Sequence, residues 1–180
     1  MPADETELAP VPMLEALERH GVRYVVIGGI AAQLRGAPIV TYDLDVSPAR
    51  DRDNLDRLAA ALSDLSGTPR IADAPASLEI PLDGAMLAGF QNLSLDTPHG
   101  QISLDTPHGQ IDLVLLPDGT RGYDDLVRAA TRVRVSGELE VPVAALADVV
   151  RSKAAAGRAK DHAQLPILRE TLEQSRRLGL

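Results

Sequence analysis

Two short motifs carry the side chains with the clearest chemical potential: a glycine pair, and an acid pair fourteen residues further on. Gly28 and Gly29 follow the apolar run Tyr24–Ile27, and Asp43 and Asp45 stand one residue apart in a second apolar run. Side chains alternate along a strand, so both carboxylates point to one face. They repel each other unless a cation lies between them, and Mg²⁺ binds through a few carboxylates together with substrate phosphates. The glycines let the backbone approach a phosphate at the start of a helix, so the two motifs predict a site for phosphate and for a metal ion, Mg²⁺ or Mn²⁺.

A third acid, Asp112, lies in the run Ile111–Leu116, which is the most strand-like stretch of the chain. A carboxylate on a buried strand is costly unless it is paired, hydrogen-bonded or bound to metal. Beside Asp43 and Asp45 it would complete a two-metal site that neutralises a triphosphate and helps to deprotonate an attacking hydroxyl. The plainer alternative is that Asp112 accepts backbone hydrogen bonds.

Composition limits the other kinds of site. The 180 residues suit one domain with a helical appendage, and the absence of cysteine excludes disulfides, thiolate metal sites and cysteine nucleophiles. The sequence has no signal-peptide pattern and no apolar stretch long enough to span a bilayer, so we expect a cytoplasmic protein without a membrane partner.

The net charge of −8 is unevenly distributed. Residues 1–120 carry 7 basic and 18 acidic side chains, whereas residues 121–180 carry 11 basic and 8 acidic ones. An acidic, metal-binding half and a mildly basic half could share one polyanionic substrate, although ordinary surface charge explains the difference equally well.

The elements expected to position these motifs form an α/β (α+β) fold, with a small mixed β-sheet flanked by helices and a C-terminal helical tail. We expect a frayed end over 1–10, a core over 11–142 and a helical segment over 143–180 that packs on the core. Helices are predicted over 12–20, 30–35, 50–65, 123–130, 143–156 and 161–177. Strands are predicted over 24–27, 42–46, 90–96 and 111–116, with a small hairpin over 133–135 and 139–141.

A nine-residue segment, 94–102, is repeated without a gap as 103–111. One copy reads as a β-hairpin around a Thr-Pro-His-Gly turn, and two copies are too few for a solenoid. We expect one copy to be looped out or to extend the hairpin tip, which leaves Asp112 in place. Deletion of residues 94–102 should then preserve both fold and activity.

Together, the glycine pair, the acid pair and the later Asp112 resemble the polymerase-β-like nucleotidyltransferase superfamily. The stretch Tyr24–Val46 is similar, more particularly, to the minimal prokaryotic nucleotidyltransferases of the AbiEii-like toxin group. So is the run 146–161, in which a helix bearing Lys153 is followed by a turn and the pair Lys160-Asp161. The resemblance covers most of residues 11–172.

This resemblance implies an enzyme that transfers a nucleoside monophosphate from an NTP to an acceptor hydroxyl, with Mg²⁺ as cofactor and release of pyrophosphate. Several members of the group are toxins that modify tRNA and are paired with an antitoxin, in toxin–antitoxin or phage-defence systems. By position, the metal ligands are Asp43, Asp45 and Asp112, of which Asp112 is also the candidate base. The implied NTP-binding residues are Gly28, Gly29, Thr41, Lys153, Arg158 and Asp161, and Lys153 also counts as catalytic because it neutralises the triphosphate.

The sequence departs from the group near Thr41. Relatives often carry a basic residue shortly before this threonine, whereas here the stretch is Pro38-Ile39-Val40. Arg35 lies where a histidine is common and is the candidate to replace part of that charge. Arg151, Arg158 and Lys160 could add a phosphate-binding patch or a solvated face.

Two alternatives remain open from the sequence. The same chemistry could act on a small molecule such as an aminoglycoside, or on a protein side chain, since the acidic half suits a cationic acceptor. The chain could also be a nucleotide-binding or partner-binding module without turnover.

Overall fold

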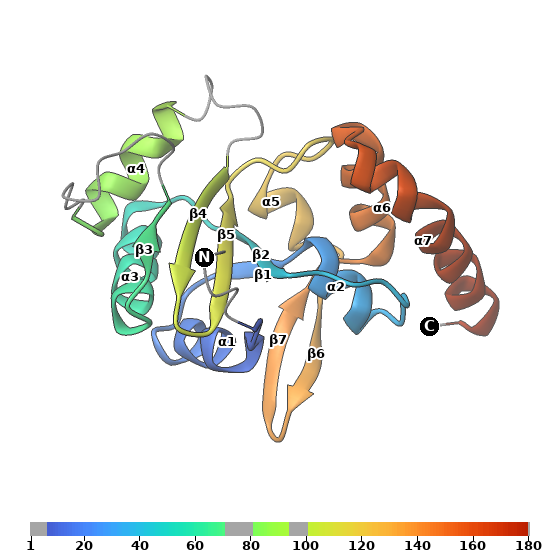
Figure 1. Ribbon diagram of the computed structural model, residues 1–180, viewed down its shortest axis with the longest axis horizontal. Coiled ribbons are helices and arrows are strands. Elements are labelled where there is room, and N and C mark those ends of the chain that lie inside the picture. The colour runs from blue at the N-terminus through green and yellow to red at the C-terminus, as the bar shows by residue number, and fades with distance from the viewer. Residues whose placement is uncertain (1–6, 71–80, 94–100, 180) are drawn as a thin grey trace, which may run out of the picture.

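The computed structural model describes residues 7–70, 81–93 and 101–179, and a seven-stranded sheet lies at its centre (Figure 1). In spatial order the strands run β3-β4-β5-β2-β1-β7-β6. The pairs β2–β5 and β1–β7 are parallel and the other neighbours are antiparallel, so the predicted mixed sheet is confirmed. The strands are β1 Tyr24–Val26, β2 Asp43–Pro48, β3 Thr68–Pro69, β4 Gln101–Thr106, β5 Gly109–Val114, β6 Thr131–Ser136 and β7 Leu139–Val143.

Helices flank this sheet in two groups. Figure 1 shows α1, α3 and α4 toward one end of the molecule and α2, α5, α6 and α7 toward the other. Helix α3 packs against α1 and α4, and α6 packs against α2 and α7. The bounds are α1 Pro10–Arg19, α2 Gly28–Leu34, α3 Arg52–Asp64, α4 Gly84–Leu93, α5 Tyr123–Leu126, α6 Leu146–Ala156 and α7 Ala159–Leu178. None of these helices is long and apolar enough to cross a membrane.

The core is built from aliphatic side chains, as the low aromatic content requires. All three residues of β1 are buried, which is typical of a strand with neighbours on both sides. In α3, Leu55, Leu58 and Leu62 are buried at helical spacing, and the Asp51 side chain caps the helix by accepting from the Asn54 N–H at 3.2 Å. This packing holds the strands that carry the acidic motifs.

One predicted strand is wrong. The run 90–96 was expected to be a strand, but residues 84–93 form helix α4, and the part from 94 lies outside the described residues. A short apolar run fits a helix as well as a strand, and here the Asp83 carboxylate accepts from the Met86 N–H at 2.7 Å in the first turn. The helix predicted over 123–130 is also shorter than expected, since α5 ends at Leu126 before the chain enters β6.

The tandem repeat forms the hairpin β4–β5. Its second copy supplies most of β4, the first half of β5 and the Pro107-His108 turn, while Gln101 and Ile102 of the first copy begin β4. The tip is therefore not extended by an extra copy, and residues 94–100 lie outside the described residues. The Ala9 N–H donates to the His108 carbonyl at 2.8 Å, so the chain just before α1 is fixed to the turn.

Candidate active site

The glycine pair occupies the turn between β1 and α2. Gly28 has a φ of +63°, and a Cβ atom added to it would lie 2.0 Å from Oδ2 of Asp45. A Cβ on Gly29 would lie 2.4 Å from Cβ of Thr41. Glycine is needed at both positions because these side chains lie directly against the backbone.

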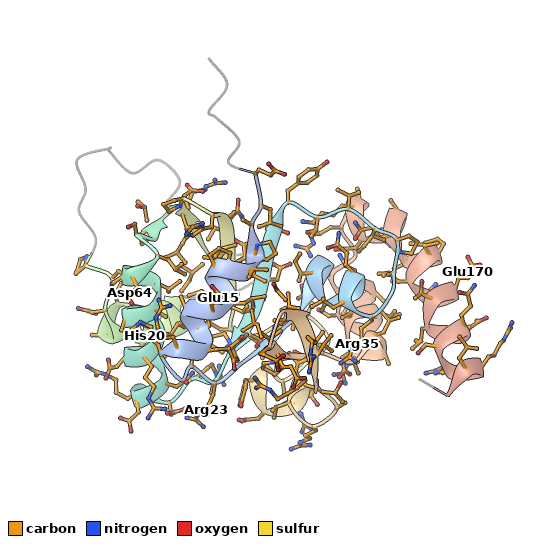
Figure 2. All side chains as sticks on the ribbon, turned by 90° about the horizontal axis from the view of Figure 1, so that it is seen from below. Glu15, His20, Arg23, Arg35, Asp64 and Glu170 are labelled. Atoms are coloured by element: carbon orange, nitrogen blue, oxygen red, sulfur yellow. The ribbon has the colours of Figure 1, made fainter. Side chains whose placement is uncertain are left out.

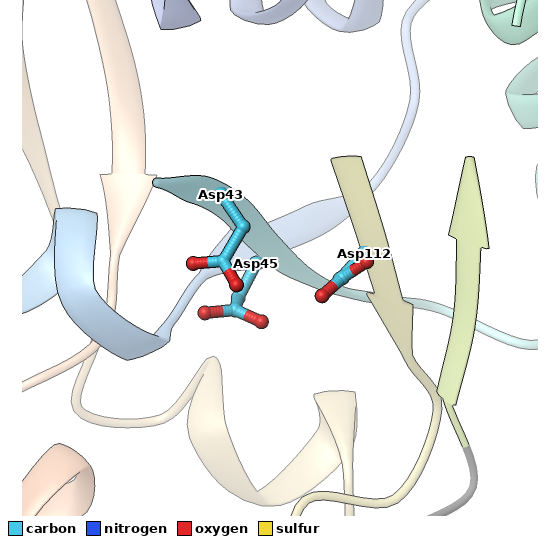
Figure 3. A group of neighbouring side chains, drawn as sticks. All are labelled: Asp43, Asp45 and Asp112. Atoms are coloured by element: carbon cyan, nitrogen blue, oxygen red, sulfur yellow. The ribbon is translucent and has the colours of Figure 1, made fainter. Parts of the chain in front are cut away.

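The three acids come together at the middle of the sheet. Figure 3 shows Asp43 and Asp45 on β2 and Asp112 on β5, with their carboxylates turned toward one another. Asp45 and Asp112 are direct neighbours in the parallel ladder, and one oxygen from each of the three acids lies within 4.8 Å of the others. Asp112 is only 1% exposed. This cluster has the donor atoms and the spacing to hold a divalent metal ion.

Burial and mutual repulsion raise the pKa values of two of the three acids. Burial, then the charges of Asp43 and Asp112, raise the pKa of Asp45 from 3.8 to about 7, against the opposing charges of Lys160 and Lys153. Burial also raises the pKa of Asp112, although hydrogen bonds from Gln110 and Ser103 oppose the shift. Carboxylates in this state gain most from a bound cation.

Side-chain donors hold two of the acids. Thr41 donates through Oγ1 to Oδ1 of Asp43 at 2.7 Å. Gln110 donates to Oδ1 of Asp112 at 2.8 Å, and Gln101 donates to Oδ2 at 2.5 Å. Sequence reasoning missed both glutamines. Alternation along β5 would have placed Gln110 on the face of Asp112, but the position of Gln101 depends on how the repeat pairs with itself.

The cationic side chains of the site come from α6 and from the N-terminal end of α7. Lys153 of α6 is 8% exposed, and its Nζ donates to Oδ1 of Asp161 at 3.0 Å. Arg158 donates through Nε to Oδ2 of the same carboxylate at 2.7 Å. Burial alone would raise the pKa of Asp161, but the hydrogen bonds from Arg158 and Lys153 outweigh it and hold the pKa below its ordinary value. Asp161 thus fixes two cations in one orientation.

One cavity of about 420 Å³ is lined both by the three acids and by these cations. This volume is in the range of small-molecule sites. The side chains that line it include the acids of β2 and β5, the Gly28-Gly29 turn, Thr41, Lys153, Arg158 and Lys160. Apolar side chains such as Ile27, Leu126 and Val149 form another part of the lining. The sequence-predicted site residues thus lie around this cavity, except Asp161, which lies behind Lys153 and Arg158.

Two candidate cations lie elsewhere. Arg35 donates to the carbonyls of Val143 and Ala144 at 2.7 and 3.0 Å, so it caps β7 instead of replacing the missing charge near Thr41 (Figure 2). Arg151 pairs with Asp125 at 2.9 Å and with Asp148 at 3.0 Å. Of the expected phosphate patch, only Arg158 and Lys160 line the cavity.

Comparison with solved structures identifies the fold. The chain superposes on TM1012 of Thermotoga maritima, a candidate nucleotidyltransferase, with a TM-score of 0.53 and 18% identity over 90% of this chain and 89% of that one. It superposes on the lincosamide antibiotic adenylyltransferase LnuA, solved with bound lincomycin, with a TM-score of 0.57 and 12% identity over 92% and 99% of the two chains. No protein-family model and no curated protein sequence matches.

The chain therefore shares the fold of these two structures, which is the mixed-sheet α/β fold that the sequence predicted. The cluster of three carboxylates lies on the strands that carry the predicted motifs. At these identities the likeness extends to the fold alone.

Proposed function

We propose that this chain is a metal-dependent nucleotidyltransferase that moves a nucleoside monophosphate from an NTP to an acceptor hydroxyl. The observation that carries the proposal is one cavity with three clustered carboxylates on one wall and Lys153, Arg158 and Lys160 on the other. Such a site can bind a cation and a polyphosphate together, since each wall neutralises one of them.

The acidic cluster fits a divalent ion. Its ligands are oxygens only, which suits Mg²⁺ or Mn²⁺, and the raised pKa of Asp45 reflects negative charge that a cation would relieve. Asp43, Asp45 and Asp112 would hold the ion, which would supply charge neutralisation at the phosphates and favour ionisation of the acceptor hydroxyl.

The chain's own residues then have distinct tasks. The acceptor oxygen attacks the α-phosphorus, the bond from that phosphorus to the bridging oxygen breaks, and pyrophosphate leaves. A carboxylate oxygen of Asp112 takes the hydroxyl proton, and Lys153 and Lys160 offset the charge that develops on the pyrophosphate. Asp161 keeps Lys153 and Arg158 oriented for this task.

For the acceptor we propose tRNA, and for the biological role a toxin of an AbiEii-like toxin–antitoxin or phage-defence pair. The sequence resemblance over Tyr24–Val46 and 146–161 supports this assignment. The excess of basic residues in 121–180 supports it further, because a polyanionic acceptor must approach an otherwise acidic protein.

A small-molecule acceptor is the second candidate. LnuA is an antibiotic adenylyltransferase, and its fold matches over 99% of its length. The acidic half of the present chain would attract a cationic or amine-bearing acceptor. Its cavity is large enough for a compact molecule beside a nucleotide phosphate.

The test is an incubation of the purified chain with Mg²⁺, each α-labelled NTP and, in parallel, total tRNA, lincomycin or an aminoglycoside. Asp43→Asn is the matched control, since it keeps the shape of the side chain and removes one ligand charge. Label on tRNA with the wild type alone supports the first candidate, and label on the antibiotic supports the second. NTP binding without any labelled product or pyrophosphate would contradict both and favour a nucleotide-binding module.

A further inference from the structure

The two copies of the repeat deliver the same residue to the same carboxylate. Gln101 and Gln110 are equivalent positions of the repeat, and they lie on the neighbouring strands β4 and β5. Each donates through Nε2 to a different oxygen of Asp112, at 2.5 Å for Gln101 and 2.8 Å for Gln110. Each oxygen of the Asp112 carboxylate therefore accepts a hydrogen bond from a side-chain amide of the same kind.

Register explains why both side chains reach it. Gln110 precedes Asp112 by two residues on β5, so both point to the same face. On β4, Ser103 is the direct partner of Asp112, and Gln101 lies two residues before Ser103 on that face. Gln101 also donates to the Ser103 hydroxyl at 3.3 Å. These side chains form a polar strip across two strands beside Asp45.

The chemistry of an amide suits this position. Each carboxylate oxygen has two lone-pair directions, and one amide on each oxygen fixes the plane of the group while leaving one direction free. A neutral donor leaves the negative charge of Asp112 intact, whereas a lysine or arginine there would neutralise the charge and compete with a metal ion. Asp112 is 1% exposed, so water has little access to replace a lost donor.

We propose that Gln101 and Gln110 are positioning residues that hold the Asp112 carboxylate in the orientation in which it completes a divalent-cation site with Asp43 and Asp45. The tandem repeat thus supplies both halves of the support. This inference rests on the proposed metal-dependent function. It assigns to the repeat a role in the site, beyond building a hairpin.

Deletion of one copy gives a specific variant. Removal of residues 94–102 joins Leu93 to Ser103. Asn92 then stands two positions before Ser103, the place of Gln101, and the end of α4 has to become extended to continue β4. The asparagine amide is one methylene shorter. The deletion should therefore weaken Mn²⁺ binding at least as much as Gln101→Asn.

The experiment measures Mn²⁺ binding by calorimetry on the metal-free protein, separately from activity. Gln101→Leu and Gln110→Leu remove one donor each at similar size, and Gln174→Leu, on an exposed glutamine of α7, is the matched control. Each donor variant should raise the Mn²⁺ dissociation constant by about tenfold or more, the usual effect of losing a hydrogen bond to a metal ligand. The Mg²⁺ concentration for half-maximal transfer should rise in parallel, and Gln174→Leu should match the wild type.

Unchanged Mn²⁺ affinity in both leucine variants would overturn the inference, even if their melting temperatures fall. If a leucine variant fails to fold, Gln101→Asn and Gln110→Asn take its place, and wild-type affinity in these shorter amides would also count against it. Failure of the proposed function is recognised separately, because the folded wild type would then neither bind Mn²⁺ nor transfer label.

Discussion

Replacement of Asp45 by asparagine should stabilise the metal-free protein above neutral pH while abolishing nucleotide transfer. Asparagine has the shape of an uncharged carboxyl group, so it keeps the contact with the Gly28 turn. It removes a charge that burial and the acids Asp43 and Asp112 make unfavourable. A residue that is costly for folding and necessary for activity is typical of a functional site.

The size of the effect follows from the pKa. Burial and the two neighbouring acids raise the pKa of Asp45 from 3.8 to about 7. The folded protein therefore keeps a proton that the unfolded chain releases near pH 4. The free energy of unfolding falls as the pH rises from about 4 to about 7. At about 1.4 kcal/mol per pKa unit, ionisation of Asp45 should lower the free energy of unfolding by about 4 kcal/mol at pH 8. About 3 kcal/mol of this decrease should occur between pH 5 and pH 8.

Urea unfolding in EDTA at several pH values between 5 and 8 measures this loss. The wild type should lose stability as the pH rises, and Asp45→Asn should lose about 3 kcal/mol less. Glu15→Gln is the control, because Glu15 is exposed on α1, a helix that carries none of the three acids (Figure 2). Mn²⁺ at pH 8 should restore stability to the wild type and much less to Asp45→Asn. Equal pH dependence in the wild type and Asp45→Asn would refute the reasoning.

Three other substitutions test separate parts of the site. Gly28→Ala should abolish activity in the transfer assay, because the added Cβ would lie 2.0 Å from Oδ2 of Asp45 and the φ of +63° strains alanine; wild-type turnover would contradict this. Asp161→Asn should lower the free energy of unfolding by about 3 kcal/mol or more near neutral pH, because Lys153 stays buried without its carboxylate. The loss should shrink below about pH 4, where the wild-type Asp161 itself gains a proton through its lowered folded pKa; a constant difference in urea unfolding down to pH 2 would argue against it. Ser47→Ala should leave the protein as stable or raise its unfolding free energy by about 1 kcal/mol, since the buried Ser47 hydroxyl has no hydrogen-bond partner among the described residues; a clear loss would indicate a bound water.

The sequence was most informative where a local pattern and a steric need coincide. The alternation around Leu44 predicts that Asp43 and Asp45 share a face, and the structure places both beside Asp112. The helical leucines of α3 could likewise be read from spacing alone. Lys153 entered the site only through the resemblance to known nucleotidyltransferases, because nothing in an alanine-rich helix marks one lysine as buried. Its catalytic role stays a prediction.

The predictions that were wrong or incomplete share a physical cause: the positions of these residues depend on partners that are distant in the chain. Arg35 was a candidate because it lies where relatives often carry a histidine, but its side chain donates to the carbonyls of Val143 and Ala144, more than a hundred residues away. The alternation in the run 90–96 predicted a strand, but residues 84–93 form helix α4, because a run this short fits either element. Gln101 takes its place from the register of β4 against β5, in which it lies opposite Val114, and either copy of the repeat could have formed the hairpin.

The spacing of the glycine and acid motifs has its own structural explanation. Strand β2 returns antiparallel to β1, with Val26 opposite Val46, so the residue before Val46 meets the turn that leaves β1. The Ile27 N–H donates to the Asp45 carbonyl at 3.0 Å, and the Asp45 side chain fills the space where a Gly28 Cβ would lie. The glycine therefore serves the carboxylate even before any phosphate is bound. Because turn and acid are packed as one unit, this motif can be recognised in sequence, whereas Asp112 and Lys153 join it only in the folded chain.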